Sequence, residues 1–134
     1  MAYKVKNEIG NIELNRKVIE YVCLRVINSF GGDLIPSDSK GRIKKPQFQG
    51  KYGEESGFVR GRYNGELMDL DIYLVIKFGI SMKETAAEFA EVLRKEMPAA
   101  TGIEIGVIKV LFVGTLADKL LKREIEFKYE RIPA

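Results

Sequence analysis

Residues 63–84 read YNGELMDLDIYLVIKFGISMKE and contain a turn, a strand and the start of a helix in succession. The Asn-Gly pair at 64–65 favours a type I′ hairpin turn, which needs a positive φ at both central positions. Across 68–78 apolar residues recur at every second position, and this alternation predicts a strand with one buried face. A glycine then ends the strand, and Ser81 with Glu84 has the spacing of a helix capping box.

The residues that precede the turn, 57–63, are expected to form the partner strand of this hairpin. A two-residue turn fixes the register of the two strands. It pairs Tyr63 with Glu66, Gly61 with Met68, Val59 with Leu70, Arg62 with Leu67, Arg60 with Asp69 and Phe58 with Asp71. The first three pairs face the core, and the last three lie on the opposite face.

Two segments have the periodicity of amphipathic helices. Apolar residues at i+4 spacing predict one helix over 16–30, which the glycine pair at 31–32 ends, and a second over 82–97, which Pro98 ends. Cys23 lies inside the first apolar stripe. We expect it to be a small buried hydrophobe, because the chain has no histidine that could activate a thiolate.

The remaining periodic segments complete a mixed fold. Residues 10–14, 103–113 and 124–130 are expected to be strands, and 115–122 one or two helical turns. The predicted class is α/β (α+β), a two-layer sandwich with β-α-β-β-α-β order and an extra C-terminal strand. Both helices are expected on one face of the sheet, within a single domain over 1–134.

The amino-acid composition argues against several classes of function. The chain of 134 residues has a net charge of +3, no histidine and one cysteine, which fits a reducing cytoplasm. No apolar run is long enough to span a membrane, and the N-terminus lacks the apolar core of a signal peptide, so no direct membrane insertion is expected. The titratable residues offer no acid–base pair or nucleophile, so we predict no enzyme activity, no cofactor and no metal.

Two short patterns could carry chemistry, and both have a simpler interpretation. Ser37-Asp-Ser-Lys40 matches the spacing of a serine–lysine nucleophile pair, but it lies in a Pro/Gly-rich loop rather than at the start of a buried helix. Asp69 and Asp71 share a strand face and could share a metal ion. With Arg60 opposite them, a solvated charged face is the favoured interpretation.

A long polar segment over 33–56 is expected to be a loop, and it is basic. Its candidate anion-contacting residues are Lys40, Arg42, Lys44, Lys45 and Lys51. Together with Arg60 and Arg62 they could form an RNA-binding module, which is the alternative function. A solubilising loop is favoured over it, because the excess of positive charge is modest, and nucleic acid is not expected as a partner.

The helix-free face of the predicted sheet is a candidate partner surface. Its residues are Phe58, Arg60, Arg62, Leu67, Asp69, Asp71, Tyr73 and Val75. A few apolar anchors among charges of both signs are typical of protein recognition surfaces. The leading hypothesis is therefore a protein that acts through protein–protein contacts.

Three segments together resemble the alkaline shock protein family of Gram-positive envelope stress response proteins. They are GNIEL at 10–14, LDIYLVIKFG at 70–79 and TGIEIGVIKV at 101–110. The resemblance covers about 10–113 and rests on the order and spacing of these segments. The basic loop and a C-terminal extension over 115–131 depart from the family pattern.

The resemblance implies a cytoplasmic, non-enzymatic scaffold or adaptor for envelope homeostasis. Some members of that family collect beneath the membrane through a separate membrane-anchored partner. For this chain it implies a protein partner, which could be a membrane-anchored protein. A homo-oligomer is a separate option. It supplies no catalytic residues.

Overall fold

The computed structural model describes residues 2–7, 10–40, 57–63 and 65–131. The elements in chain order are β1 (Ala2–Asn7), β2 (Gly10–Asn15), α1 (Arg16–Asn28), β3 (Leu34–Pro36), β4 (Val59–Tyr63), β5 (Met68–Lys77), α2 (Met82–Thr101), β6 (Ile105–Leu116) and β7 (Leu120–Tyr129).

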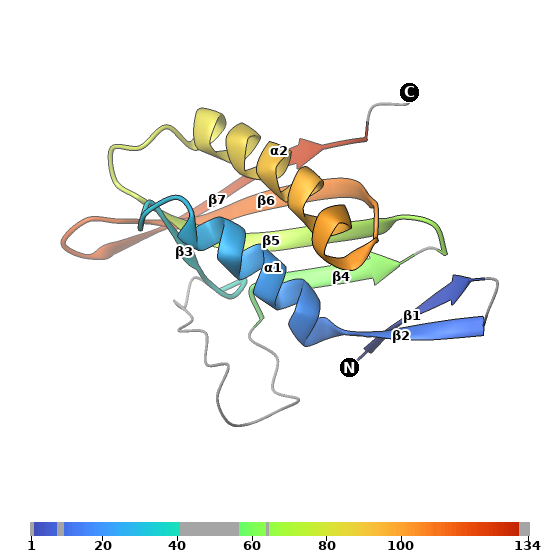
Figure 1. Cartoon of the computed structure of the whole chain (residues 1–134). Coiled ribbons are helices and arrows are strands. Elements are labelled where there is room, and N and C mark those ends of the chain that lie inside the picture. The colour runs from blue at the N-terminus through green and yellow to red at the C-terminus, as the bar shows by residue number, and fades with distance from the viewer. Residues whose placement is uncertain (1, 8–9, 41–56, 64, 132–134) are drawn as a thin grey trace.

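A mixed sheet and two helices on one of its faces make up the two layers of the fold (Figure 1). β5 pairs parallel with β6, and β6 pairs antiparallel with β7. On its other edge β5 pairs with β4 and then with β3, both antiparallel, so these two short strands lie end to end. The two-layer α/β class, with both helices on one face, is confirmed.

β5 is the central strand because its apolar alternation matches a sheet face that the helices cover. Its five core-facing side chains are fully buried, namely Met68, Leu70, Ile72, Leu74 and Ile76. The predicted buried face is therefore confirmed. Phe78, which the same alternation placed on that face, follows the end of the strand and is 63% exposed.

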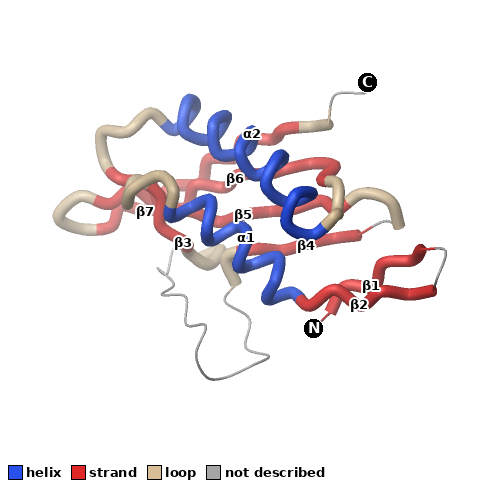
Figure 2. Tube along the Cα trace, in the orientation of Figure 1, coloured by secondary structure: helices blue, strands red, loops and turns tan. Residues whose placement is uncertain are grey.

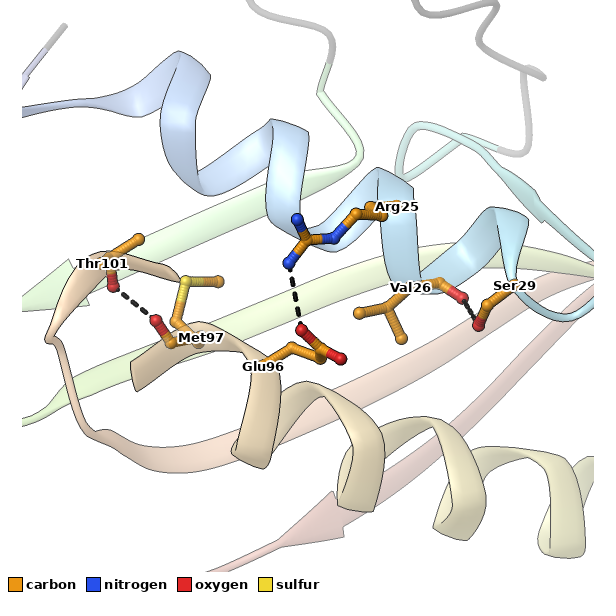
Figure 3. Close-up of polar contacts among 6 residues, drawn as sticks. All are labelled: Arg25, Val26, Ser29, Glu96, Met97 and Thr101. Carbon is orange, nitrogen blue, oxygen red and sulfur yellow. Dashed lines mark hydrogen bonds and ion pairs between the residues drawn. The ribbon is translucent and has the colours of Figure 1, made fainter. Parts of the chain in front are cut away.

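The helices pack against each other as well as against the sheet. Phe30, just after α1, and Phe89 of α2 have ring centroids 6.0 Å apart, and Arg25 of α1 bonds Glu96 of α2 at 3.0 Å (Figure 3). Both charged side chains of this ion pair are nearly half exposed, so water screens it and the apolar contacts dominate. Cys23 is fully buried in this layer, as predicted, and burial raises the pKa of its thiol well above the usual range.

The N-terminal cap of α2 is confirmed and its predicted end is wrong. Ser81 Oγ accepts a hydrogen bond from the Glu84 N–H at 3.3 Å. The helix continues past Pro98 to Thr101, and Gly102 closes it in the left-handed conformation with φ 79°. Proline is tolerated in this last turn because it removes only one backbone hydrogen bond there. The helix end is closed by the Gly102 N–H, which donates to Pro98 O at 2.8 Å.

The register of the β4–β5 hairpin differs by two residues from the prediction. Tyr63 pairs with Met68, so the connection spans 64–67, and Asn64 itself lies outside the described residues. A shift of two residues keeps every side chain on its face, so the hydrophobic pattern cannot distinguish the two registers. The choice between them therefore lies outside the periodicity of the sequence.

Three further segments differ from the prediction. The helical turns expected over 115–122 are instead the end of β6, a tight turn and the start of β7, because Leu116 pairs with Leu120 across a hairpin. β3 lies within the segment expected to be a loop; three residues are too few to show a periodicity. β2 forms as predicted but pairs with β1 in a separate hairpin outside the main sheet.

Candidate interaction face

The face of the sheet opposite the helices gathers mostly polar side chains from four strands. Residues paired across neighbouring strands point to the same face, so the register defines its members. They are Arg60 and Arg62 on β4, Asp69, Asp71 and Tyr73 on β5, Lys109 and Leu111 on β6, and Glu126 and Lys128 on β7. We call this set the open face.

Two pre-arranged pairs lie at its β4 side. Both terminal nitrogens of Arg62 donate to the two carboxylate oxygens of Asp71, at 2.9 and 3.1 Å. This fork-like contact raises the pKa of the Arg62 guanidinium. The guanidinium carbon of Arg60 lies 5.6 Å from the centre of the Tyr73 ring, within the range of a cation–π contact.

These pairs are diagonal contacts across the β4–β5 register, and they differ from the predicted pair of Arg60 with Asp69. Arg60 lies directly opposite Asp71, and Arg62 directly opposite Asp69. Each arginine side chain nevertheless contacts the residue two positions further along β5 from its direct partner. The long side chains reach these diagonal neighbours, as is common across antiparallel strands.

Asp69 is turned into the sheet rather than toward a ligand. Its Oδ1 accepts a hydrogen bond from the Val107 N–H at 2.9 Å, at a point where β6 carries one residue more than β5. Asp69 and Asp71 thus have different partners. Among the residues the structure describes, no group of three or more potential metal-ligating side chains (cysteine or acidic) comes together.

Two residues predicted for the partner surface are buried instead. Phe58 is 1% exposed: it precedes β4, so strand alternation does not apply to it, and its carbonyl accepts the Tyr73 N–H at 2.8 Å. Val75 is fully buried between Ile35 of β3 and Gly114 of β6. Both belong to the fold, and Leu67 is half-buried in the β4–β5 connection.

Lys40 is the described member of the predicted anion-contacting loop. It is exposed, whereas Arg42, Lys44, Lys45 and Lys51 lie outside the described residues. Lys40 lines a depression of about 570 Å³ that also involves Val113 and the start of β7. The β7 residues there are Lys122, Arg123 and Glu124.

The serine–lysine spacing does not form a helical nucleophile site. Ser37 pairs beside β5 through its N–H, which donates to Tyr73 O at 3.1 Å, and its hydroxyl donates to Asp38 O at 3.0 Å. Ser37 is fully buried, while Lys40 is exposed. Residues 37–40 therefore follow the end of strand β3 and do not form the first turn of a buried helix.

Sequence reasoning missed the contribution of β6 and β7 to the open face. Lys109 pairs with Asp71 on one side and Lys128 on the other, so one row of charges crosses from β4 to β7. The signal was present in the off-core positions of the two later strands. It could not be used without the parallel pairing of β5 with β6, which joins residues far apart in the chain.

No family model, curated protein or solved structure matches this chain. In the part of the chain that the structure describes, no helix is both long and apolar enough to cross a membrane.

Proposed function

We propose that this chain is a non-enzymatic scaffold or adaptor that binds another protein through the open face. The observation that carries the proposal is the pairing geometry at β4 and β5. An ion pair and a cation–π contact hold two exposed arginines beside a half-buried tyrosine, on the face of the sheet opposite both helices. Arginine and tyrosine are among the residue types most enriched at the energetic centres of protein interfaces.

Pre-arranged side chains reduce the entropy that binding must remove. Arg62 has already lost part of its rotamer freedom through its two hydrogen bonds to Asp71. The stack of Arg60 on Tyr73 does the same for a second long side chain. A partner can therefore meet a shaped surface with less ordering cost than free arginines would impose.

The charge pattern favours a protein partner over RNA. The open face carries four cationic side chains, Arg60, Arg62, Lys109 and Lys128, and three carboxylates, Asp69, Asp71 and Glu126. A surface that tracks phosphates is expected to be predominantly basic. Alternating signs instead suit a partner with its own mixture of charges.

The biological setting of the proposal comes from the resemblance to the alkaline shock protein family. On this resemblance, the proposed setting is the cytoplasm and envelope stress homeostasis, with access to the membrane through a membrane-anchored partner. Flotation with lipid vesicles tests the last point. The chain alone should stay with the soluble fraction, and direct flotation would contradict a partner-mediated location.

Site-specific crosslinking tests the surface itself. A photo-crosslinking amino acid replaces Arg60 in one variant and the exposed Lys83 of α2 in a matched control. We expect a protein adduct at position 60 that is absent at position 83, identified by mass spectrometry. The adducted protein is then purified and its affinity for the chain measured.

The expected result is that Arg60→Glu weakens this binding about tenfold or more while the melting temperature stays unchanged. Lys83→Glu, with the same change in net charge, should leave binding intact. Adducts dominated by RNA would support the alternative function. Equal protein adducts at positions 60 and 83 would contradict the open face as the binding surface.

A further inference from the structure

β7 is a long strand at the edge of the sheet. It pairs with β6 on one side, and no described strand pairs with its other side (Figure 2). It spans ten residues, whereas the opposite edge is divided between β3, with three residues, and β4, with five. Unpaired backbone groups along such an edge can pair with another strand.

The β7 edge also exposes apolar side chains. Leu121 is 43% and Ile125 is 38% exposed, although Ile125 lies opposite the buried Phe112 in the register with β6. No proline interrupts the strand between 120 and 131. Short edge strands and prolines, two common means of protecting an edge, are therefore missing from β7.

The charges of β7 are arranged for pairing with a second copy of the same strand. Glu126 and Lys128 lie on the open face. Glu124 and Lys122 follow at every second position, across a point where β7 carries one residue more than β6, and Glu130 is the first residue after the strand. Antiparallel pairing centred on Glu126 places Glu124 opposite Lys128 of the partner subunit, and Lys122 opposite Glu130 of the partner subunit. The two-fold symmetry repeats each favourable pair.

Neighbouring registers are less favourable. If the two-fold axis lay at Ile125, Glu124 would pair with Glu126 of the partner subunit, and Lys122 with Lys128 of the partner subunit. Each of these like-charge pairs would occur twice. If the axis lay at Phe127, Glu126 would form a favourable pair with Lys128 of the partner subunit. Glu124, however, would lie opposite Glu130 of the partner subunit. The register centred on Glu126 opposes like charges at the central position alone, and it places Ile125 beside Phe127 of the partner subunit on the other face.

From this self-complementarity we infer that two copies of the chain pair antiparallel through β7, with the two-fold axis at Glu126. The sheet then continues across both subunits, and both pairs of helices lie on the same side of it. The exposed Ile125 gains an apolar neighbour. The intrachain ion pair of Lys128 with Glu130, at 3.4 Å, is solvent-exposed and weak enough to be replaced.

Pairing through β7 does not depend on what the open face binds. If the proposed function holds, the dimer joins two open faces into one surface, and a partner with two copies of its own site gains avidity. The dimer and the open face are tested by different variants, so one can fail while the other stands.

Charge exchange tests the register. Sedimentation equilibrium over a wide range of protein concentration should show a monomer–dimer equilibrium for the unchanged chain. Glu124→Lys or Lys128→Glu alone creates two like-charge contacts, and each should raise the dimer dissociation constant about tenfold. The double variant restores opposite charges and should restore dimerisation. Lys83→Glu, the matched control, should dimerise as the unchanged chain does.

Disulfide crosslinking tests the symmetry axis. Directly opposed residues in antiparallel strands lie about 4.5–5.5 Å apart, within reach of a disulfide. Glu126→Cys should therefore crosslink with itself under mild oxidation, since the native Cys23 is buried. Glu124→Cys and Lys128→Cys should not crosslink alone but should crosslink when mixed. A monomer at all concentrations, or self-crosslinking at 124 instead of 126, would overturn the inference.

Discussion

The carboxylate of Asp69 on β5 accepts a hydrogen bond from the backbone N–H of Val107 on β6, at 2.9 Å. The bond lies where the two parallel strands lose their regular register. On the helix side, Arg94 of α2 donates to the carbonyls of Ile105 and Gly106, at 2.8 and 3.0 Å. Side chains from two elements thus satisfy backbone groups of this irregularity.

Asp69→Ala should lower the free energy of unfolding by about 1–3 kcal/mol, because it leaves the half-buried Val107 N–H without this acceptor. Asp69→Asn keeps an acceptor oxygen and should cost less. Urea denaturation of both variants provides the measurement. An alanine variant as stable as the unchanged chain would show that water replaces the carboxylate without cost.

Gly106 should not tolerate alanine, for a reason tied to Asp69. A Cβ at position 106 would lie 2.5 Å from Asp69 Oδ1 and 3.3 Å from Leu67 Cβ. We expect Gly106→Ala to cost about 1–3 kcal/mol through displacement of the carboxylate. In a double-mutant cycle with Asp69→Ala, the double variant should lose less unfolding free energy than the sum of the losses in the two single variants. Full additivity would mean that the two positions are uncoupled.

Arg94→Lys should destabilise the chain although it keeps the positive charge. The guanidinium contacts three backbone carbonyls, two on β6 and Tyr129 O on β7 at 3.1 Å, and a lysine ammonium cannot reproduce that planar geometry. Partial burial lowers the pKa of Arg94, so its desolvation must be offset by these bonds. We expect a loss of about 2–3 kcal/mol. Exposed Lys95→Arg serves as the control and should change little.

Cys23 should make the chain sensitive to alkaline pH. Burial raises the pKa of the thiol in the folded state, so above the pKa of the unfolded thiol the unfolded state binds fewer protons than the folded state. The contribution of Cys23 to the free energy of unfolding is therefore fully present below about pH 8.5. Above that pH it falls by about 1.4 kcal/mol per pH unit.

Denaturation at pH 7 and pH 10 measures this effect. From pH 7 to pH 10, the free energy of unfolding of the unchanged chain should fall by about 2 kcal/mol more than that of Cys23→Ala. The cost of the substitution itself is the same at both pH values and does not enter this difference. Lysines and tyrosines titrate in both proteins, so their contribution cancels in the comparison. An identical pH dependence would show that the unfolded thiol does not titrate in this window.

The sequence alone determined those features that depend on local periodicity. The alternation in β5 identified which of its residues face the core, and the i+4 stripes identified the buried faces of α1 and α2. Ser81 and Gly31 could be placed near helix ends because capping chemistry involves only the adjacent turn. All of these signals act over a few residues.

Tertiary structure decided which segments meet. The hairpin register, the burial of Phe58 and Val75, and the pairing of Asp71 with Lys109 all depend on contacts between residues far apart in the chain. A two-residue slip preserves every local pattern, so periodicity cannot choose between registers. In the folded chain, β5 pairs with β4 on one side and β6 on the other, and Arg94 donates to the carbonyls of Ile105 and Gly106 where β6 is irregular. Backbone groups enclosed in this way must find partners from other segments, which no local pattern specifies.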